Sequence, residues 1–574
     1  MAEDIPNNIP HENRPDEVDS DQDGQVQNQA ANHAAPLTPH RLFRSALLVI
    51  IGFVLTKSVS FGQVFIIADR FGAGAEYDTF GAANQLPAQL VKLLAGGALT
   101  VAFIPVFSGL LNRNNADGAW KLASQVFNTL LIVVFSLSII AAITAPWIIE
   151  YILAPGFNDG QVEQAAILLR ILLLSTMLFT LSGSIAGMLQ GHNHFLLPVV
   201  LAPIFQDIGL LIGIVVFTEW WGIYGVAWGT VFGALLHIGV QIPGLFIFKA
   251  RWSFSLGWND PRLREVVRLM LPRMIASAIF TVNFAAMTNI ASRFGDGGIS
   301  SFEFGLRIMD IPEALIGTAL GIVVFPTLAA LTELGKFEDR YRVFSEALRF
   351  VLVATIPAAA GMLLIGKPAV DILFTDGGEA SLVYASVQVF AFAMILQAVH
   401  EIIARAFYAQ KDTITPLIAS TAGMVGNFAI LIIAFTLYQN VDFIPRSSPL
   451  GVGIPAMGYL AAFVVELGWL TIVLKRRWGG LDEERVLDVV KRTLAATVFM
   501  AIPVLILDNI LAQKIYTADP QKAGIIRAGM GGLLGLVFFA VGAYLFNIQE
   551  VRGFPAMVRQ QLFTRAKQDA ESSV

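Results

Sequence analysis

Several charged residues stand inside long apolar stretches of this chain, and four of them are candidates for one site: Lys57, Lys92, Arg307 and Asp310. A charge at the middle of a bilayer costs about 2.5–3.5 kcal/mol even on the scale derived from insertion experiments. Each of these residues therefore needs a partner or a cavity. Lysine supplies a compact positive charge, and arginine supplies a planar fork that binds two oxygens at once. Basic groups that face one cavity would neutralise an anionic group such as a diphosphate.

Each of these residues also has a structural interpretation. Arg307 and Asp310 are three positions apart, so they could pair with each other on one helix. Lys92 could extend along apolar surface to the membrane boundary, and Lys57 could pin two helices through an ion pair. Asp78 follows a Phe-Gly-Ala-Gly turn, where an aspartate can accept hydrogen bonds from the free amides of a helix start.

Other polar residues in the apolar stretches are interpreted as structural. Glu401 and Arg405, four positions apart, are expected to form an ion pair. The isolated groups are expected to pack or to lie at interfaces; they are Arg170, Asp207, His237, Arg273 and Glu466. The chain has no cysteine, no Walker loop and no histidine cluster with metal spacing, so we expect no ATP hydrolysis, no metal and no other cofactor.

Composition places these residues in a membrane. Of 574 residues, 55% are hydrophobic and 14% are charged, whereas soluble domains carry about a quarter charged residues. This composition excludes a soluble nucleic-acid-binding domain. We predict an all-helical protein with about fourteen transmembrane helices, since a span needs about 20 apolar residues. The predicted spans are 43–69, 79–110, 119–149, 161–190, 196–218, 222–248, 264–292, 299–332, 345–374, 379–409, 415–438, 451–474, 485–511 and 523–547.

An internal repeat recurs after about 220 residues. Residues 70–74 (RFGAG) match 293–297 (RFGDG), and 96–105 (GGALTVAFIP) match 317–326 (GTALGIVVFP). Pro198 and Pro416 close two similar polar links. Each copy holds six spans, an even number, so both copies have the same orientation. This predicts two lobes related by a pseudo-twofold axis along the membrane normal, with a cavity between them.

The predicted organisation has five parts. Residues 1–40 form a disordered acidic tail, 41–250 the first lobe and 251–477 the second. Residues 478–548 add a helix pair without a counterpart in the repeat, and 549–574 form a basic amphipathic tail. Lysine and arginine gather on one side of the spans, which predicts that both termini are cytoplasmic.

Several segments are similar to those of the MviN/MurJ family of lipid II flippases, within the multidrug/oligosaccharidyl-lipid/polysaccharide exporter superfamily. They are FGAGAEYDTF (71–80), APGF (154–157), LRIMDIPEALIGTALGIVVFP (306–326) and FYAQKDTITP (407–416). The resemblance runs from about Lys57 to Phe546. It implies a multi-pass protein of the bacterial plasma membrane that is a transporter and not an enzyme. Its implied cargo is lipid II, an undecaprenyl-diphosphate-linked peptidoglycan precursor, carried from the inner to the outer leaflet for cell-wall synthesis.

The resemblance also implies site residues. In the family, basic residues at the positions of Lys57 and Arg307 belong to the substrate cavity, and the acids at Asp78 and Asp310 are important as well. Lys92 matches the second member of a family basic pair. A groove bordered by the last two spans is implied for the lipid tail. A coupling ion or the membrane potential would supply energy, and we expect a monomer surrounded by membrane lipids.

The first copy departs from the family pattern. Gln63 and Val64 stand where the family usually has Arg-Asp, Val91 replaces the first member of the basic pair, and Gly96 replaces an acid. Three interpretations stay open: a lipid II flippase, an exporter of another lipid-linked oligosaccharide, and a non-transporting membrane scaffold with the same fold. The strongest substrate contact is expected on the eighth span, which keeps its charges.

Overall fold

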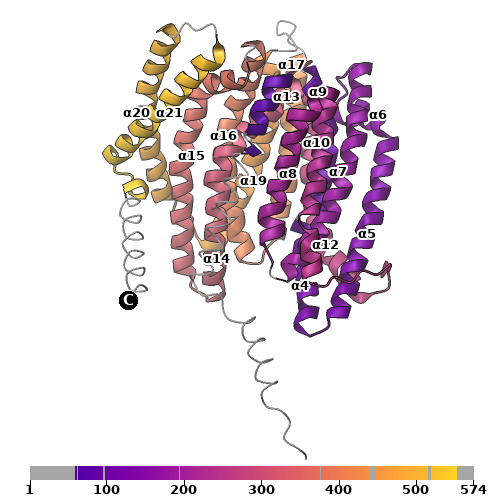
Figure 1. Cartoon of the computed structure of the whole chain (residues 1–574). Helices are drawn as coiled ribbons and strands as arrows, with labels where there is room; N and C mark the ends of the chain where they lie inside the picture. The colour runs from indigo at the N-terminus through magenta and orange to yellow at the C-terminus, as the bar shows by residue number, and fades with distance from the viewer. Residues whose placement is uncertain are drawn as a thin grey trace, which may run out of the picture. The chain divides into compact units, whose positions relative to one another are not determined.

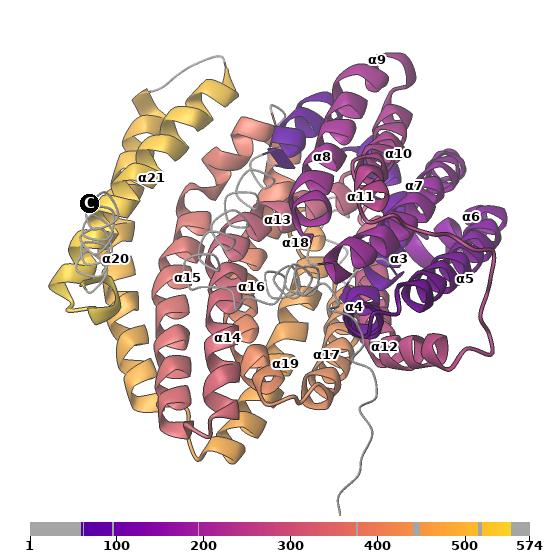
Figure 2. The same ribbon diagram turned by 60° about the horizontal axis from the view of Figure 1, so that its bottom comes forward.

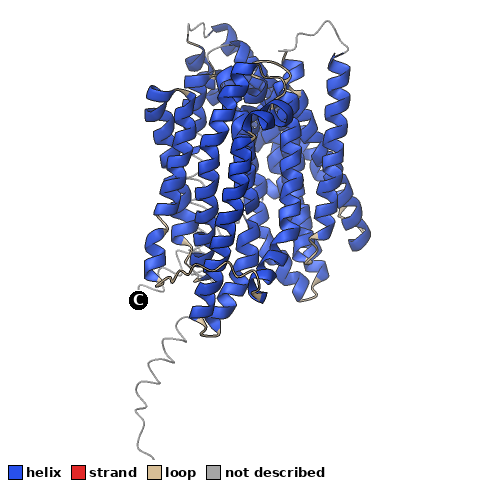
Figure 3. Ribbon diagram, turned by 90° about the vertical axis from the view of Figure 1, so that its right-hand side faces the viewer, coloured by secondary structure: helices blue, strands red, loops and turns tan. Residues whose placement is uncertain are grey.

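The computed structural model describes residues 59–60, 62–94, 97–192, 194–374, 377–439, 448–514 and 519–552. Within these ranges the chain is helical and contains no strand (Figures 1 and 3). Lys57, Gly96 and the acidic tail 1–40 lie outside the described residues, as does most of the basic tail. The predictions made for them therefore stay predictions.

Eleven helical segments among the described residues are long and apolar enough to cross a membrane, and each coincides with a predicted span. They are Ala116–Ile143, Asp159–Gly191, Leu196–Trp221, Ile223–Ile247, Gly298–Glu333, Phe337–Leu373, Gly377–Ala409, Ile414–Gln439, Pro449–Trp478, Glu483–Lys514 and Pro520–Leu545. Of the other three predicted spans, 264–292 lies on a helix of 32 residues. The span 79–110 is divided between two helices, and 43–69 lies mostly outside the described residues. The total of fourteen is thus not confirmed.

The first copy is built from α3 to α11, with three short π-helical segments. The elements are α3 (Ala75–Leu94), α4 (Gly97–Asn112), α5 (Ala116–Ile143), α6 (Ala145–Trp147), η1 (Ile148–Leu153), α7 (Asp159–Gly191), η2 (Leu196–Leu201), α8 (Ala202–Ile212), η3 (Gly213–Phe217), α9 (Thr218–Trp221), α10 (Ile223–Gly239) and α11 (Ile242–Ile247). Helical residues 59–60 and 62–71 precede them.

The second copy and the additional helix pair follow. The second copy contains α12 (Pro261–Ser292), α13 (Gly298–Glu313), η4 (Ala314–Thr318), α14 (Ala319–Glu333), α15 (Phe337–Leu373), α16 (Gly377–Ala409), α17 (Ile414–Gln439), α18 (Pro449–Val452) and α19 (Ile454–Trp478). The additional pair is α20 (Glu483–Lys514) and α21 (Pro520–Leu545). These two helices pack on each other and on α15 (Figure 2).

The two copies of the repeat pack in the same way. In the first copy α7 lies against α3, α5 and α10, and α8 lies against α10. In the second copy α16 lies against α13, α15 and α19, and α17 lies against α19. These helices occupy equivalent places in the repeat, so the sequence match at the turns extends to the packing. The helix α12 joins the copies, because it contacts α17 as well as α3 and α4.

The arginine of each repeated turn fastens the turn to the fifth span of its own copy. Arg70 donates hydrogen bonds to the hydroxyl of Thr218 and, at 3.2 Å, to the carbonyl of Val215. The guanidinium of Arg293 lies 5.5 Å from the ring centre of Phe435 on α17. The arginines are therefore scaffold residues, which accounts for their place in the repeated motif.

Candidate functional site

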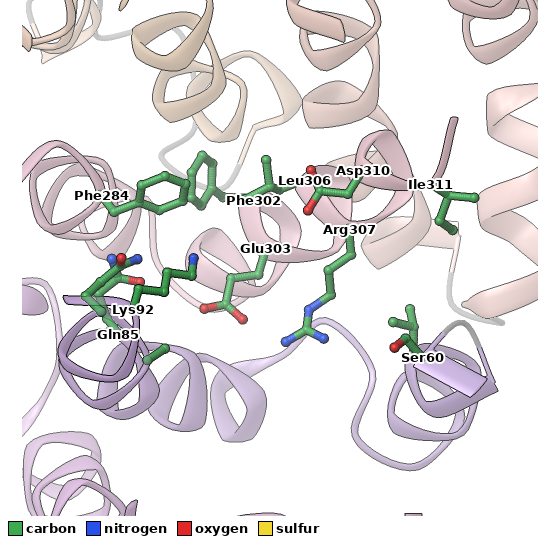
Figure 4. Close-up of a pocket in the computed structure, with 13 residues that line it drawn as sticks. Ser60, Gln85, Lys92, Phe284, Phe302, Glu303, Leu306, Arg307, Asp310 and Ile311 are labelled. Carbon is green, nitrogen blue, oxygen red and sulfur yellow. The ribbon is translucent and has the colours of Figure 1, made fainter. Parts of the chain in front are cut away.

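A cavity of about 310 Å³ lies between the two copies. The first copy lines it with residues of α3 and of the helical residues 59–60 and 62–71, and the second copy lines it with residues of α12 and α13. Its charged side chains are Lys92 from α3 and Glu303, Arg307 and Asp310 from α13. Figure 4 shows Lys92, Glu303 and Arg307 converging on one space. The structure thus places three of the predicted site residues in one cavity.

The spacing of the charges on α13 explains why they share the cavity. Glu303, Arg307 and Asp310 are four and three positions apart, so they lie on one face of the helix. The residues between them on the opposite face are buried, among them Phe304 and Met309. The helix therefore presents a charged face to the cavity and an apolar face to the protein interior, where the ring of Phe304 stacks on that of Tyr77 from α3 with 4.7 Å between the ring centres.

Arg307 is directed toward the first copy. Figure 4 shows its guanidinium pointing away from the carboxylate of Asp310. A simple local pair between Arg307 and Asp310, the structural alternative raised by the sequence, does not describe this arrangement.

Sequence reasoning missed Glu303. Its Oε2 atom is buried and has no hydrogen-bond partner among the described residues. It stands four positions before Arg307, and this acid–base spacing inside an apolar span could have identified it. The cavity therefore combines two cations and two carboxylates among its described residues, and it is less basic than the sequence suggested.

Lys92 reaches the cavity from the last turn of α3. Its Nζ atom lies 5.8 Å from the ring centre of Phe280 and 6.0 Å from that of Phe284, both on α12. Such cation–π contacts hold an ammonium group by the electron-rich face of a ring. Lys92 and Arg307 also both line a neighbouring cavity of about 280 Å³. The two cations therefore lie on opposite copies around a common space.

Asp78 is buried at the contact between the copies, with 1% of its surface exposed. Its Oδ2 accepts from the amide of Gly297 at 2.8 Å, and its Oδ1 accepts from the amide of Ser300 at 2.6 Å and from the Ser300 hydroxyl. These groups begin α13. Asp78 thus caps a helix, as one interpretation of the sequence allowed, but the helix belongs to the other copy.

Further hydrogen bonds join the copies at the same end of the bundle. Gln161 donates to Asp296 at 2.9 Å, and the amide of Gly156 donates to the hydroxyl of Ser292 at 3.2 Å. A Cβ atom at Gly156 would lie 2.0 Å from the carbonyl oxygen of Ser292, so only glycine fits the APGF motif here. Together with Asp78, these contacts form what we call the inter-copy seal.

The structure shows the surroundings of three residues that depart from the family pattern, Gln63, Val64 and Val91. Gln63 is buried and donates to the backbone carbonyl of Asp207 at 2.8 Å, so it binds α8. Val64 lines the cavity between the copies, and Val91 lines the neighbouring one. The side of the cavity formed by the first copy is therefore largely uncharged. Among its described residues, Lys92 carries the positive charge.

An all-helical chain with two equivalently packed copies and a charged cavity between them has the architecture of a multi-pass membrane transporter. The family model for lipid II flippase MurJ matches residues 67–519. This chain belongs to the MurJ family of lipid II flippases, as its sequence motifs indicated, and it is a transporter and not an enzyme.

Individual relatives agree with this assignment. A probable lipid II flippase MurJ of Rhizobium meliloti is 26% identical over 510 residues, which cover 84% of this chain and 91% of the relative. The lipid II flippase MurJ of Burkholderia cenocepacia is 27% identical over 418 residues, which cover 70% of this chain and 78% of the relative.

Solved structures share the fold. A lipid II flippase MurJ in an inward closed conformation superimposes with a TM-score of 0.70 at 20% identity, over 87% of this chain and 99% of that one. A multidrug resistance transporter of the MATE family in an inward-facing conformation gives a TM-score of 0.61 at 15% identity, over 75% and 98%. At these identities the likeness concerns the fold alone.

Proposed function

We propose that this chain carries lipid II from the inner to the outer leaflet of the bacterial plasma membrane, for peptidoglycan synthesis, by alternating access. One observation carries the proposal beyond family membership: Lys92 and Arg307 enter a common space from opposite copies. A diphosphate held between them would bind both copies at once. Binding would thereby be linked to the relative position of the copies, as alternating access requires.

The proposed cycle begins with the headgroup near Arg307 and Lys92. The lobes, 41–250 and 251–477, then rock so that the inter-copy seal opens and the cavity faces outward. The excess of lysine and arginine on the opposite side supports placing the seal at the outer face and the termini in the cytoplasm. Moving two uncompensated negative charges outward gains about 4.6 kcal/mol at 100 mV, from about 2.3 per charge.

The test is reconstitution of the full chain in vesicles with fluorescent lipid II in both leaflets. Exposure of the label to a membrane-impermeant quencher should rise with protein and stay low in vesicles that lack it. A vesicle set with a different undecaprenyl-diphosphate oligosaccharide examines the second candidate, which the uncharged cavity lining at Val64 and Val91 favours. Transport of neither lipid would leave the scaffold interpretation.

The lipid tail has a candidate site beside the additional helix pair. A cavity of about 480 Å³ lies between α15, α20 and α21. Apolar residues and glycines line it, including Pro357, Met500, Val504 and Gly535. Such a lining suits a polyprenyl chain and offers nothing to a saccharide, so we place the tail here while the headgroup occupies the cavity between the copies.

Filling the tail site should slow transport. Gly535→Leu would put a side chain into this cavity, since its nearest neighbours, Val504 and Met500, leave 3.6–3.8 Å around a Cβ atom. The leucine side chain would occupy space proposed for the polyprenyl chain, so we expect about a tenfold lower flipping rate in vesicles, which corresponds to about 1.4 kcal/mol. Gly529→Leu on the same helix is the control, because its Cβ meets nothing within 4 Å. Equal rates for the two variants would contradict this place for the tail.

Neutralising Glu303 should tighten binding. Its carboxylate lines the same cavity as Arg307 and would repel a diphosphate held there. The repulsion between two unit charges near 4 Å is about 4 kcal/mol at an effective dielectric constant of 20, which is an upper bound. We expect Glu303→Gln to lower the Kd for lipid II about tenfold and to slow release. Equilibrium binding to purified protein measures this, with exposed Glu338→Gln as control; an unchanged Kd would remove Glu303 from the site.

A further inference from the structure

A second group of ionisable side chains lies inside the second copy. His400 of α16 and Glu466 of α19 approach within 3.1 Å, Nε2 to Oε1. The hydroxyl of Ser420 on α17 donates to the same carboxylate oxygen. The two side chains are 17% and 12% exposed. We call these three residues the His400 cluster. Glu466 thus lies where helices meet, as the sequence interpretation allowed, but it has partners and does not stand alone, and His400 was not identified from the sequence.

Three helices meet at the His400 cluster. The helix α16 packs on α19, and α17 packs on α19 (Figure 2). An ionisable pair between membrane-spanning helices is energetically costly. Such pairs therefore often mark functional sites, and proton relays are a common example. When a histidine–glutamate contact bridges two helices, a change in its charge can shift the helices relative to each other.

The charged surroundings of His400 are acidic. Glu466 on α19, Glu401 on α16 and Glu313 on α13 all act on it electrostatically. Arg405 is bound to Glu401 at 2.8 Å, so its charge is directed to that partner. An imidazolium formed at His400 would therefore be stabilised by neighbouring carboxylates, of which Glu466 is in direct contact.

Glu313, one of the acids in the surroundings of His400, stands on α13, the helix that lines the central cavity. It is buried and lies three positions after Asp310, which lines the cavity. The π-helical segment η4 begins directly after it, and Thr318 of that segment donates to Glu313 at 3.1 Å. π-helical turns occur frequently at functional sites. A proton at His400 would thus act on the helix that carries Arg307.

The first copy contains a related arrangement without the acid. The offset between Ser182 and His400 equals that between Pro198 and Pro416, so they are equivalent positions on α7 and α16. Ser182 bonds to Nδ1 of His237 on α10 at 2.7 Å, and Gln241 donates to Ser182 at 2.6 Å. Both copies therefore place a histidine in a bond between their fourth and sixth spans, but only the second copy pairs it with a carboxylate.

We propose that the His400 cluster binds one proton in each transport cycle and thereby couples flipping to a proton gradient. The proposal rests on the proposed flipping function. When Nε2 donates to Glu466, the lone pair of Nδ1 accepts the proton. The same nitrogen releases the proton after the lobes have changed to their other orientation. Histidine titrates between about pH 5 and 8. Sodium and potassium prefer oxygen ligands, so an imidazole in this position favours a proton over these ions.

The experiment uses vesicles that contain the full chain and fluorescent lipid II, with potassium and valinomycin holding the membrane potential at zero. A pH gradient of one unit should shift the ratio of lipid II between the leaflets by up to about tenfold for one coupled proton. Reversing the gradient should reverse the shift. Either sign supports coupling, and it reports whether the proton moves with or against the lipid.

His400→Gln keeps a donor for Glu466 but accepts no proton. We expect this variant to exchange lipid II between leaflets and to lose the response to the gradient. His237→Gln in the first copy is the matched control and should respond as wild type does. A pH dye trapped inside wild-type vesicles supplies an independent measurement, because lipid II transport should change the interior pH. This measurement does not depend on the folding of any variant.

The outcomes separate two failures. Wild-type vesicles that flip lipid II without responding to the gradient or changing their interior pH would overturn the proton proposal and leave the flippase intact. A His400→Gln variant that responds like wild type would also overturn it. Vesicles that flip no lipid II under any gradient would instead refute the proposed function.

Discussion

Replacing Arg307 by alanine should reduce the flipping rate about 10- to 100-fold. The guanidinium enters the cavity from α13 toward the first copy and is the planar group there that can bind two phosphate oxygens together (Figure 4). Hydrogen bonds to charged groups contribute about 1.5–3 kcal/mol, and each 1.4 kcal/mol corresponds to about tenfold. Arg307→Lys keeps the charge without the fork and should fall between alanine and wild type.

Two measurements check this prediction. The variant is expressed in cells depleted of their own flippase, and it is also reconstituted in vesicles with fluorescent lipid II. We expect no rescue of growth and a slow rate with normal protein level. Arg342→Ala is the control, because Arg342 is exposed and pairs with Asp339 at 3.1 Å on the surface. If Arg307→Ala restored growth and flipped lipid II as wild type does, the headgroup site would lie elsewhere.

Replacing Asp78 by alanine should open the inter-copy seal and stop productive transport. The substitution would leave the amides of Gly297 and Ser300 without their acceptor in a buried place, whereas the Ser300 hydroxyl would keep the carbonyl of Gly74 at 3.2 Å. Each unsatisfied buried group costs about 1–3 kcal/mol. Two such groups lower the free energy that holds the seal closed by at least about 2 kcal/mol, which shifts a two-state equilibrium more than tenfold.

The opening of the seal can be measured directly. The chain has no cysteine, so a single cysteine at cavity residue Gln89 reports access from outside through a membrane-impermeant maleimide. Asp78→Ala should raise the labelling rate and lower flipping. Asp519→Ala is the control: Asp519 caps its own helix, α21, through the amides of Gln521 and Lys522, and its loss should cost about 1 kcal/mol without altering labelling. Unchanged labelling of the Asp78 variant would show that the seal does not depend on this cap.

The Asp78 cap is an example of what could be predicted from the sequence and what could not. The position after a glycine turn indicated a helix cap, because capping is a local property of residue type. The capped helix is more than 200 positions away, at Gly297 and Ser300. No local pattern specifies which distant amides meet a carboxylate.

The residues of the cavity can also be divided into those that the sequence identified and those that only the structure revealed. Arg307 and Asp310 were identified because a charge inside an apolar span is conspicuous, and the structure places both in the cavity. Glu303 was missed although its spacing of four positions from Arg307 places it on the same helix face, because only the structure shows that this face borders the cavity. Gln63 looked like a lost charge, and the structure shows a buried side chain bonded to the backbone of Asp207. The predicted role of Lys57 remains a prediction.

By itself, the sequence determined that this is a multi-pass helical membrane protein with an internal repeat and a MurJ-like set of motifs. Hydropathy, span length and repeated turns are written in consecutive residues, so they can be read without contacts. Only the tertiary structure decided that Lys92 and Arg307 share a space, that Asp78 caps the other copy, and that His400 meets Glu466. These are contacts between helices distant in the chain, and the packing of whole helices, rather than any local pattern of residues, selects the partner of each side chain.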